Sequence, residues 1–468
     1  MFRQALVEVL EGRRLLTSAF PIGIGSSGAD FADSIASDRL NNVIVVGTLA
    51  AATDVDTGAG TVTVPAGGFV AKYDASGTLI WGRQFPGTTI TKVATDGGNS
   101  VYVVGSYSGT VDVDPRKGVH NLTSVGGTDA FICKLSTNGN FQLAASVGGK
   151  GDDVAEALAV DSAGNMFIGG TFKARANFDP NGAFSIGNSG GTDGFIDALD
   201  ANGAFRWAGS FGGPGDDNTT DLAVDDSGNV VGTGRYLGDV DFNPGKAVSS
   251  ANVAGTLQSY VLKWDSTGAF VFGDGFGGTG VTFGSAVTVD RDGTVYSTGN
   301  FTGTADFDPT GGTFNLIAPA TGLVYVDKLS PTGLLIYAKS LGGSASQDIG
   351  PGEIAVDKGR NVYVSGTFSG TQDFNPGPGT SNLTSAGQND IFTAKLDSSG
   401  GFVFATRQGG PLDDSSEGLV LDRDGNILTD GEFSDTANLG TDANVVNFTS
   451  NGDTDIFVSK VDSNGVLA

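Results

Sequence analysis

Short hydrophobic runs separated by polar turns follow one another along nearly the whole chain. In one representative stretch the runs lie at 158–160, 166–168, 194–199 and 204–208. Tight turns at 161–165 and 200–203 join the first pair and the last pair, and a longer segment joins the middle two. Short apolar runs bounded by Gly, Asn and Asp are typical of β-strands joined by hairpins. The stretch therefore predicts four antiparallel strands, with an irregular connection between the second and the third.

This pattern is an internal repeat. The Asp that opens the first turn recurs 58 to 67 residues apart, at Asp38, Asp96, Asp161, Asp225, Asp290, Asp357 and Asp422. An aromatic residue of the third run recurs at the same rate, at Phe69, Phe131, Phe195, Tyr260, Tyr325, Phe392 and Phe457. Two independent landmarks thus predict seven units of about 65 residues, and a fixed period of this kind indicates a repeat architecture.

The runs do not alternate between apolar and polar residues, so both faces of each predicted sheet should be buried. Sheets packed face to face provide that environment. The first run is rich in small residues such as Ala155, Ala157 and Ala159, which suits strands that crowd around an axis. The fourth run carries bulkier residues that suit a wider rim: Trp81, Leu143, Trp207, Phe272, Tyr337 and Phe404. We therefore expect an all-β chain that forms a β-propeller.

The two ends of the repeat array complement each other. Residues 20–38 align without a gap onto 207–225, so the array begins at the fourth run of a unit. Ala468 matches Arg206, the residue just before that run, so the seventh unit lacks its fourth run. An N-terminal strand that completes the last unit leaves no exposed solenoid end. The sequence thus predicts a leader at 1–18 and, at 19–468, a single seven-bladed β-propeller of four-stranded antiparallel blades, closed by its N-terminal strand.

Two stretches of the chain resemble known bacterial families. The units around 354–366 and 390–400 resemble the bacterial β-propeller repeat called SBBP, over residues 20–468. Residues 10–16, Leu-Glu-Gly-Arg-Arg-Leu-Leu, resemble a motif near the start of exported bacterial surface proteins; the alternative is an amphipathic helix without that role. The resemblance implies an extracellular or cell-surface protein. The chain has no standard signal peptide and no apolar run long enough for a transmembrane segment.

Composition narrows the function further. A net charge of −26 argues against nucleic acid as a partner. The acidic residues comprise 46 Asp and 6 Glu, a bias typical of turns. Cys133 and His120 are the single residues of their kinds, which excludes an intrachain disulfide and a His-based zinc site. No unit carries a nucleophile elbow before a helix. We expect no enzymatic activity, although a carbohydrate-active enzyme that uses paired loop carboxylates stays an alternative.

Antiparallel connectivity places the tight turns on one face of the ring and the longer connections on the other. Long loops on a rigid scaffold usually carry the binding site. The longer connections contain the Asp-x-Asp/Asn-Pro and Gly-Asp-Asp motifs. The predicted ligand-face residues are Asp112, Asp114, Asp152, Asp153, Asp179, Asp216, Asp217, Asp241, Asp306, Asp308 and Asp373.

Calcium is the cofactor that these motifs could bind. The pairs Asp112 with Asp114 and Asp306 with Asp308 could each offer two oxygens to Ca²⁺, but a turn that uses Asp to cap backbone amides explains them equally well. The runs at 290–294 and 422–426 begin like a calcium-binding loop, but they lack its later ligands.

A recurring Lys of the third run could form an anion site around the axis, but we expect each Lys to pair with a nearby Asp. The Lys residues are Lys72, Lys134, Lys263, Lys328, Lys395 and Lys460.

The sequence thus favours a monomeric, non-enzymatic binding or scaffold propeller without a cofactor. Its acidic, loop-rich face would bind an unknown protein or glycan. A calcium-dependent adhesion module is the alternative that the paired carboxylates leave open.

Overall fold

The computed structural model describes residues 20–243, 250–251, 256–308, 310–343 and 348–468. The expected leader at 1–18, with its export-like motif, lies outside these residues. The described chain contains β-strands and no helix, and therefore no helix long and apolar enough to cross a membrane. Most strands belong to four-stranded antiparallel sets, and each set is named here by its innermost strand.

In chain order, the sets consist of the following strands: β2 (Phe31–Ser37), β3 (Val43–Leu49), β6 (Gly67–Tyr73) and β7 (Leu79–Phe85); β8 (Thr88–Thr95), β9 (Val101–Asp112), β10 (Asn121–Leu135) and β11 (Phe141–Gly149); β12 (Val154–Val160), β13 (Met166–Phe172), β16 (Asp193–Leu199) and β17 (Phe205–Phe211); β18 (Asn218–Val224), β19 (Val230–Leu237), β22 (Leu257–Trp264) and β23 (Phe270–Gly278); β24 (Thr282–Val289), β25 (Val295–Asp306), β26 (Asn315–Leu329) and β27 (Leu335–Leu341); β28 (Ile349–Val356), β29 (Val362–Asp373), β30 (Asn382–Leu396) and β31 (Phe402–Gln408); and β32 (Ser415–Leu421), β33 (Ile427–Asn438), β34 (Asn447–Val461) and β1 (Ile22–Ile24). Short pairs lie in the connections between second and third strands: β4 (Thr53–Asp54) with β5 (Thr63–Val64), β14 (Arg175–Asn177) with β15 (Ser185–Gly187), and β20 (Val240–Asp241) with β21 (Ser250–Ala251).

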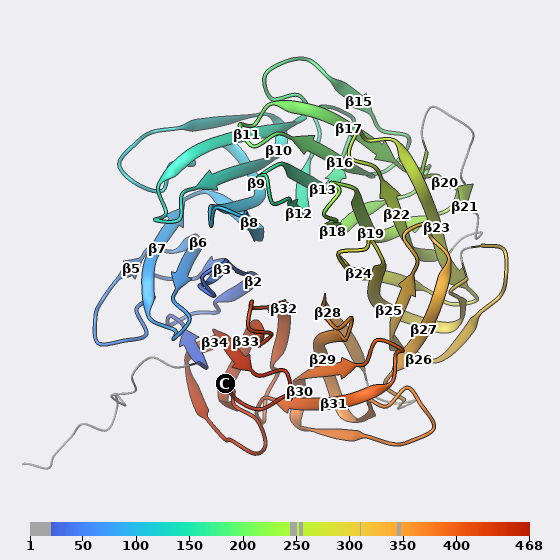
Figure 1. The fold of residues 1–468 in the computed structure, drawn as a ribbon. Coiled ribbons are helices and arrows are strands. Elements are labelled where there is room, and N and C mark those ends of the chain that lie inside the picture. Colours follow the sequence, from blue (N-terminus) through green and yellow to red (C-terminus); the bar gives the residue numbers. More distant parts are fainter. Residues whose placement is uncertain (1–19, 244–249, 252–255, 309, 344–347) are drawn as a thin grey trace, which may run out of the picture.

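The sets stand around a common axis, with the first strand of each innermost (Figure 1). Each innermost strand contacts the innermost strand of the next set, and β32 also contacts β2. At this junction β1 pairs with β34, with Ile22 opposite Val458 and Ile24 opposite Ile456. The architecture is an all-β propeller in which the two ends of the described chain lie side by side.

The tight turns owe their shape to Asp. In the β12–β13 turn, Asp161 Oδ1 accepts the backbone N–H groups of Ala163 and Asn165, both at 2.9 Å. Gly164 has a φ of 86°, a conformation that costs glycine little. The β16–β17 turn is capped in the same way by Asp200, and its backbone hydrogen bonds from Ala204 and Asn202 lower the pKa of that carboxyl. Repetition of this cap in many turns explains the excess of Asp over Glu.

Four of the six repeated Lys residues ion-pair with the turn Asp of their own set, whereas Lys328 and Lys395 donate to the carbonyl oxygens of Ser398 and Ser463. Lys72 Nζ lies 2.7 Å from Asp38 Oδ2, and Lys263 Nζ lies 3.1 Å from Asp225 Oδ2. Lys460 Nζ similarly lies 3.0 Å from Asp422 Oδ2. The expectation that these lysines are structural is therefore confirmed for these pairs.

The expected irregular connection between second and third strands is wrong for four of the sets. In the β8, β24, β28 and β32 sets these strands extend to 12 and 15 residues and continue as a hairpin after a shift in register. In the β8 set the tip of this hairpin folds back to the β10–β11 tight turn, where Arg116 Nη1 donates to Asn140 Oδ1, so this connection, contrary to expectation, does not lie on the face opposite the tight turns. The extension is held by cross-strand pairs such as Thr110 with Thr123, whose hydroxyl oxygens lie 2.9 Å apart. A local repeat, Asn-Leu/Phe-Thr-Ser at 121, 382 and 447, marks the returning strand.

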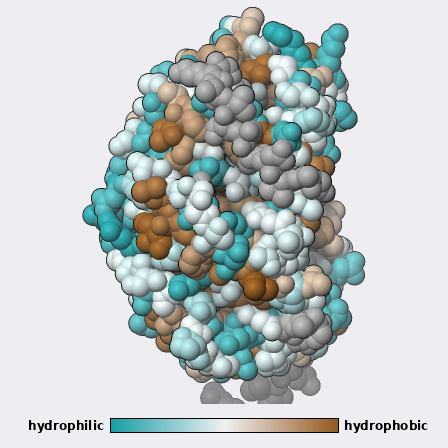
Figure 2. Space-filling model, turned by 90° about the vertical axis from the view of Figure 1, so that its right-hand side faces the viewer, coloured by the Kyte–Doolittle hydropathy of each residue, from teal (hydrophilic) through white to brown (hydrophobic). Residues whose placement is uncertain are grey.

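Hydrophobic residues on the outer rim are scattered. Figure 2 shows one side of the rim, where hydrophobic side chains lie in small groups among hydrophilic ones. Val271, Ile317 and Leu334 are among the exposed hydrophobic residues of the chain. Scattered exposed apolar residues are common on protein surfaces, and the described residues on this side of the rim form only small apolar groups.

Candidate binding face and axial channel

The Asp-x-Asp motifs cap their own loops. Asp112 Oδ1 accepts the N–H of Asp114 at 3.1 Å and that of His120 at 2.8 Å. Asp306 and Asp373 accept the equivalent pairs of N–H groups, and Asn438 makes the same two bonds with an amide oxygen. Because a neutral Asn replaces Asp without a change of geometry, the acceptor oxygen matters here and the charge does not.

The second residue of each motif caps the next turn. Asp114 Oδ1 accepts the N–H of Arg116, and Asp308 Oδ1 accepts that of Thr310. Asp179 does the same for Asn181, whereas Asp241 is a first residue and, like Asp112, accepts the N–H of the residue two positions later, Asn243. Within the described residues, no group of three or more His, Cys, Asp or Glu side chains is arranged to hold a metal ion. The geometry supports the capping interpretation of these motifs.

Substitutions at Asp112 separate the cap from a calcium ligand. Asp112→Asn keeps an acceptor oxygen, so we expect the exchange rates of the Asp114 and His120 amide protons to stay within about threefold of wild type. Asp112→Ala removes two hydrogen bonds, and we expect local opening to become easier by about 1–3 kcal/mol. Hydrogen exchange followed by NMR or mass spectrometry measures both effects. Equal losses in the two variants, or calcium-dependent protection in wild type, would contradict the cap.

The Gly-Asp-Asp motifs join one set to the next. Asp153 accepts the N–H groups of Gly149 and Lys173, and Asp217 accepts those of Gly213 and Leu237. Both carboxylates are only 1% exposed. The prediction that Asp153 and Asp217 lie on a ligand-binding face is therefore wrong, because both are buried staples between sets.

The first Asp of each motif is also engaged. Asp152 accepts the N–H of Thr128, and Asp216 accepts that of Thr192. Asp152 and Asp216 each lie in the connection between two sets and hold the third strand of the earlier set by this hydrogen bond.

A second buried carboxylate faces each staple. Asp390 lies opposite Asp414, and oxygens of both flank Gly409. Burial raises the pKa of Asp390 to about 6, although Arg407 Nη1, 3.3 Å from Asp390 Oδ2, partly lowers it. Burial, together with the charge of Asp390, raises the pKa of Asp414 to about 7. The same arrangement recurs with Asp129 and Asp153, Asp193 and Asp217, and Asp455 and Asp30. One oxygen of each third-strand Asp has no hydrogen-bond partner among the described residues, namely Asp129 Oδ1, Asp193 Oδ1, Asp390 Oδ1 and Asp455 Oδ1.

One junction replaces this carboxylate pair with two hydrophobic residues. Leu323 and Ile349 both lie against Gly342, which corresponds to Gly409. Leu323 is 6% exposed and Ile349 is 3% exposed. The site therefore accepts either two carboxyl groups or two aliphatic side chains, as expected if the carboxyl groups are protonated and neutral when buried.

The axis carries most of the glutamates. Four of the six Glu residues belong to the described chain, and all lie on strands next to the axis: Glu156 on β12, Glu353 on β28, Glu417 on β32 and Glu432 on β33. Glu156, Glu353 and Glu417 occupy the β-bulge of their innermost strand, where the register shifts. A bulge re-aims one side chain away from the regular pleat. The longer Glu is thus used where the chain lines the channel.

One lysine forms ion pairs across the axis of the ring. Lys92 Nζ, from β8, lies 2.9 Å from Glu353 Oε2 of β28 and 3.7 Å from Asp221 Oδ1 of β18. These strands belong to sets that are not neighbours, so the ion pairs cross the axis. Burial alone lowers the pKa of Lys92, but Glu353 and Asp221 outweigh it and raise that pKa. Lys92 therefore stays charged.

A cluster of carboxylates lies near Lys92, on β2, β32 and β33. Burial and the nearby Glu417 raise the pKa of Asp33 to about 7 and that of Glu432 to about 8. Glu432 Oε1 accepts the N–H of Ala32 at 2.8 Å, which ties β33 to β2. Burial together with Glu432 and Glu417 also raises the pKa of Asp430. At neutral pH this cluster holds protons that isolated carboxylates would have lost.

Four cavities open among the tight turns. The largest measures about 570 Å³ and lies between the β24–β25 turn and the β28–β29 turn. Others of about 480, 240 and 210 Å³ lie between the neighbouring turns around the axis. Arg39 and Arg423 line one of them, Arg291 lines two, and Lys358 and Arg360 line the largest. The tight-turn face thus combines hollows with exposed cations.

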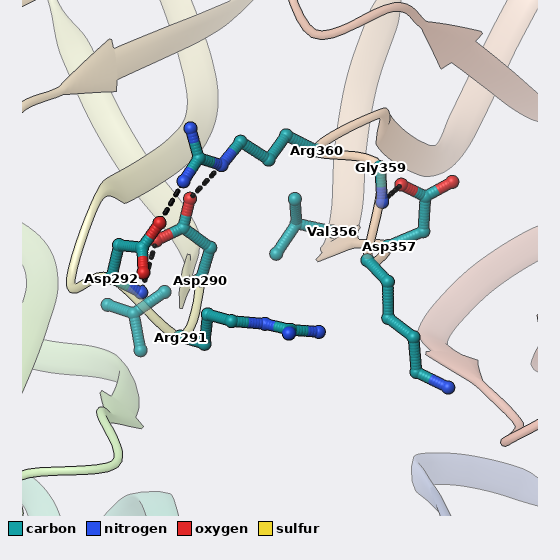
Figure 3. Close-up of a pocket in the computed structure, with 9 residues that line it drawn as sticks. Asp290, Arg291, Asp292, Val356, Asp357, Gly359 and Arg360 are labelled. Atoms are coloured by element: carbon teal, nitrogen blue, oxygen red, sulfur yellow. Dashed lines mark hydrogen bonds and ion pairs between the residues drawn. The ribbon is translucent and has the colours of Figure 1, made fainter.

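Arg360 links the two turns that form the largest cavity. Figure 3 shows its side chain reaching from the β28–β29 turn to the carboxylates of Asp290 and Asp292. Arg360 has a φ of 65°, at a turn position where Gly164 and Gly425 stand in other sets. A left-handed conformation is costly for Arg, so the turn keeps this residue at the expense of backbone strain.

The cavities and the axial cluster were not predicted from the sequence. Two signals were nevertheless present. Glu is confined to a few positions of a chain that otherwise uses Asp, and basic residues follow the first-turn Asp in several units, as in Asp290-Arg291 and Asp422-Arg423.

The chain has partial sequence similarity to two known proteins. No family model matches the chain. It is 23% identical, over 88% of its length, to an uncharacterised WD repeat-containing protein of Acanthamoeba polyphaga mimivirus, of which it spans 36%. It is 31% identical, over 35% of its length, to the regulatory protein FlaEY of Caulobacter vibrioides, of which it spans 17%. The chain thus covers only a minor part of either relative.

Two solved structures are similar at low identity. The Dos1 propeller has a TM-score of 0.42 at 9% identity, covering 93% of this chain and 94% of its own. A Bacteroides caccae protein of unknown function has a TM-score of 0.30 at 8% identity, covering 68% of this chain and 93% of its own.

Proposed function

We propose that the chain is a non-enzymatic binding scaffold: a single seven-bladed propeller, closed by β1 in the last blade, that takes a protein ligand at the tight-turn end of its axis. The contact of β32 with β2 and the pairing of β1 with β34 support the closed ring. The resemblance to SBBP repeats supports a place outside the cytoplasm.

The observation that carries this proposal is the position of the cavities. All four cavities described above lie among the tight turns, on the face that carries Arg291, Lys358 and Arg423. Concave sites with a few polar groups are the usual binding sites of folded domains. The opposite face is the weaker candidate, because its carboxylates are used as loop caps and staples.

Photo-crosslinking from each face tests the proposal. We expect a photoreactive amino acid in place of the exposed Ser162, beside the tight-turn cavities, to give a discrete adduct in cells that produce the protein. The matched position on the opposite face is the exposed Lys150, in the connection between β11 and β12, where we expect no discrete adduct. A discrete adduct from Lys150 alone, or none from either position, would contradict the proposed binding end.

A further inference from the structure

The residue after the first-turn Asp occupies the same place in every repeat. In chain order this place holds Arg39, Gly97, Ser162, Asp226, Arg291, Lys358 and Arg423. The cations therefore come from the β24, β28, β32 and β2 sets, which follow one another around the ring because β32 contacts β2. The other sets present Gly97, Ser162 and Asp226. The basic residues thus form one continuous arc, and the remainder of the mouth has none at this place.

The side chains of the arc are exposed and available. Arg291 and Lys358 line the largest cavity and make no ion pair within the described residues. The carboxylates beside them are occupied: Asp290 accepts two backbone N–H groups and pairs with Arg360, and Asp357 accepts the N–H groups of Gly359 and Asn361. Arg291 and Lys358 are therefore not held by these carboxylates, and both side chains are available to a ligand that enters the cavity.

Hydrogen bonds join the turns that carry Arg39 and Arg423, at the end of the arc away from Arg291. Arg423 Nη1 donates to the carbonyl oxygen of Arg39 at 3.3 Å, and Asn41 joins the same two turns by hydrogen bonds to Arg423 N and Asp424. Arg39 N is held in turn by Asn99 Oδ1. The turns that carry these cations are linked to one another, so the cations keep their spacing.

We propose that this basic arc binds an acidic peptide segment of the partner protein, through several Asp or Glu carboxylates at once. The inference rests on the proposed function and assigns the ligand's chemistry. Cations spread over consecutive turns suit an extended chain with repeated charges, whereas a single phosphate group needs donors that converge on one point. The net charge of −26 is spread over the whole chain and repels any anionic ligand at a distance. At about 0.15 M salt the Debye length is about 8 Å, so distant carboxylates are screened while cations in contact are not.

Fluorescence anisotropy with a labelled oligoglutamate peptide tests the arc at that ionic strength. We expect saturable binding to the full chain, weakened about tenfold or more by Arg291→Gln with Lys358→Gln. The matched control is Lys150→Gln with Arg175→Gln, one exposed lysine and one exposed arginine at the opposite end of the strands, for which we expect no change. Ser162→Arg lengthens the arc, and we expect it to strengthen binding.

Competition distinguishes the possible ligands. Unlabelled oligoglutamate should displace the probe, whereas inorganic phosphate at the same total charge should not. Equal competition by phosphate, equal loss in the control pair, or no binding at all would overturn the acidic-peptide assignment. If Ser162 still yields a discrete crosslinked partner in that case, the binding end stands and only the ligand chemistry is wrong. If neither crosslink nor peptide is found, the proposed function falls as well.

Discussion

Removing residues 1–25, and with them β1, will cost most of the stability of the protein. Phe20, Ile22 and Ile24 are 5%, 3% and 1% exposed, packed in the core shared by the first and last sets. Burial of one such side chain contributes about 1.5–3 kcal/mol, so their loss amounts to roughly 5–9 kcal/mol before the backbone bonds to β34 are counted. Total stabilities of about 5–15 kcal/mol leave little beyond that. Urea unfolding followed by tryptophan fluorescence, with limited proteolysis, measures the loss.

A transplanted strand provides the matched control. In the truncated chain, residues 20–25 are fused directly after Ala468, where the repeat pattern expects a fourth run. The bridge between Val461 and Leu467 already starts that hairpin. We expect the fusion to recover most of the lost stability. The transplanted strand can pair with β34 in the same antiparallel register as β1, but it is now connected to β34 by a hairpin turn. A truncation that unfolds like the full chain would show that β1 does not hold the ends together.

The second large effect is an unusual dependence of stability on pH. We expect the free energy of unfolding to be highest near pH 4–5 and to fall by several kcal/mol towards pH 8. Burial raises the pKa of Asp153 and Asp217 to about 6 and that of Asp414 to about 7. A carboxyl whose pKa is raised in the folded state favours folding fully below its unfolded pKa of about 4, and this contribution disappears as the pH rises through the folded pKa.

The turn caps set the acidic limit. Hydrogen bonds from backbone amides lower the pKa of Asp200 and Asp462. Groups of this kind stabilise the folded state above their unfolded pKa and lose that contribution as the pH falls through the lower, folded value. Stability should therefore decline again in strong acid, which places the maximum between the two ranges.

The chain itself suggests the variant that tests this explanation. Asp193→Leu with Asp217→Ile copies the junction of Leu323 and Ile349 at a pair that makes no ion pair within the described residues. We expect the double variant to lose part of the decline between pH 5 and pH 8, a gain on the order of 3 kcal/mol at pH 8. Thermal and urea unfolding across this pH range measure it. A wild-type protein that gains stability from pH 5 to pH 8, or a variant with an unchanged profile, would contradict the protonated pairs.

The fold could be predicted because each repeat contains the same local sequence signals for strands and turns. Turn residues such as Asp161 and Gly164 specify hairpins, and runs buried on both faces require packed sheets. The extended hairpins were missed because Thr110 and Thr123 stabilise each other across strands, an interaction that no local pattern displays. The staple role of Asp153 was missed because burial depends on the neighbouring set, whereas the sequence shows only a polar motif.

The binding face was harder to predict than the fold. Loop length and the number of carboxylates favoured the long connections, but a carboxylate that accepts backbone N–H groups, as Asp112 does, is no longer available to a ligand. The basic arc depends on circular adjacency, because Arg39 and Arg423 meet only when the ring brings together residues from opposite ends of the chain.

The position of Lys92 has a consequence for transport along the axis. Its ammonium group, held between Glu353 and Asp221, obstructs the interior of the ring. Any passage along the axis would therefore have to break a charge pair that is largely removed from water, a costly step. Release of a molecule through the end at which it docked requires no such step.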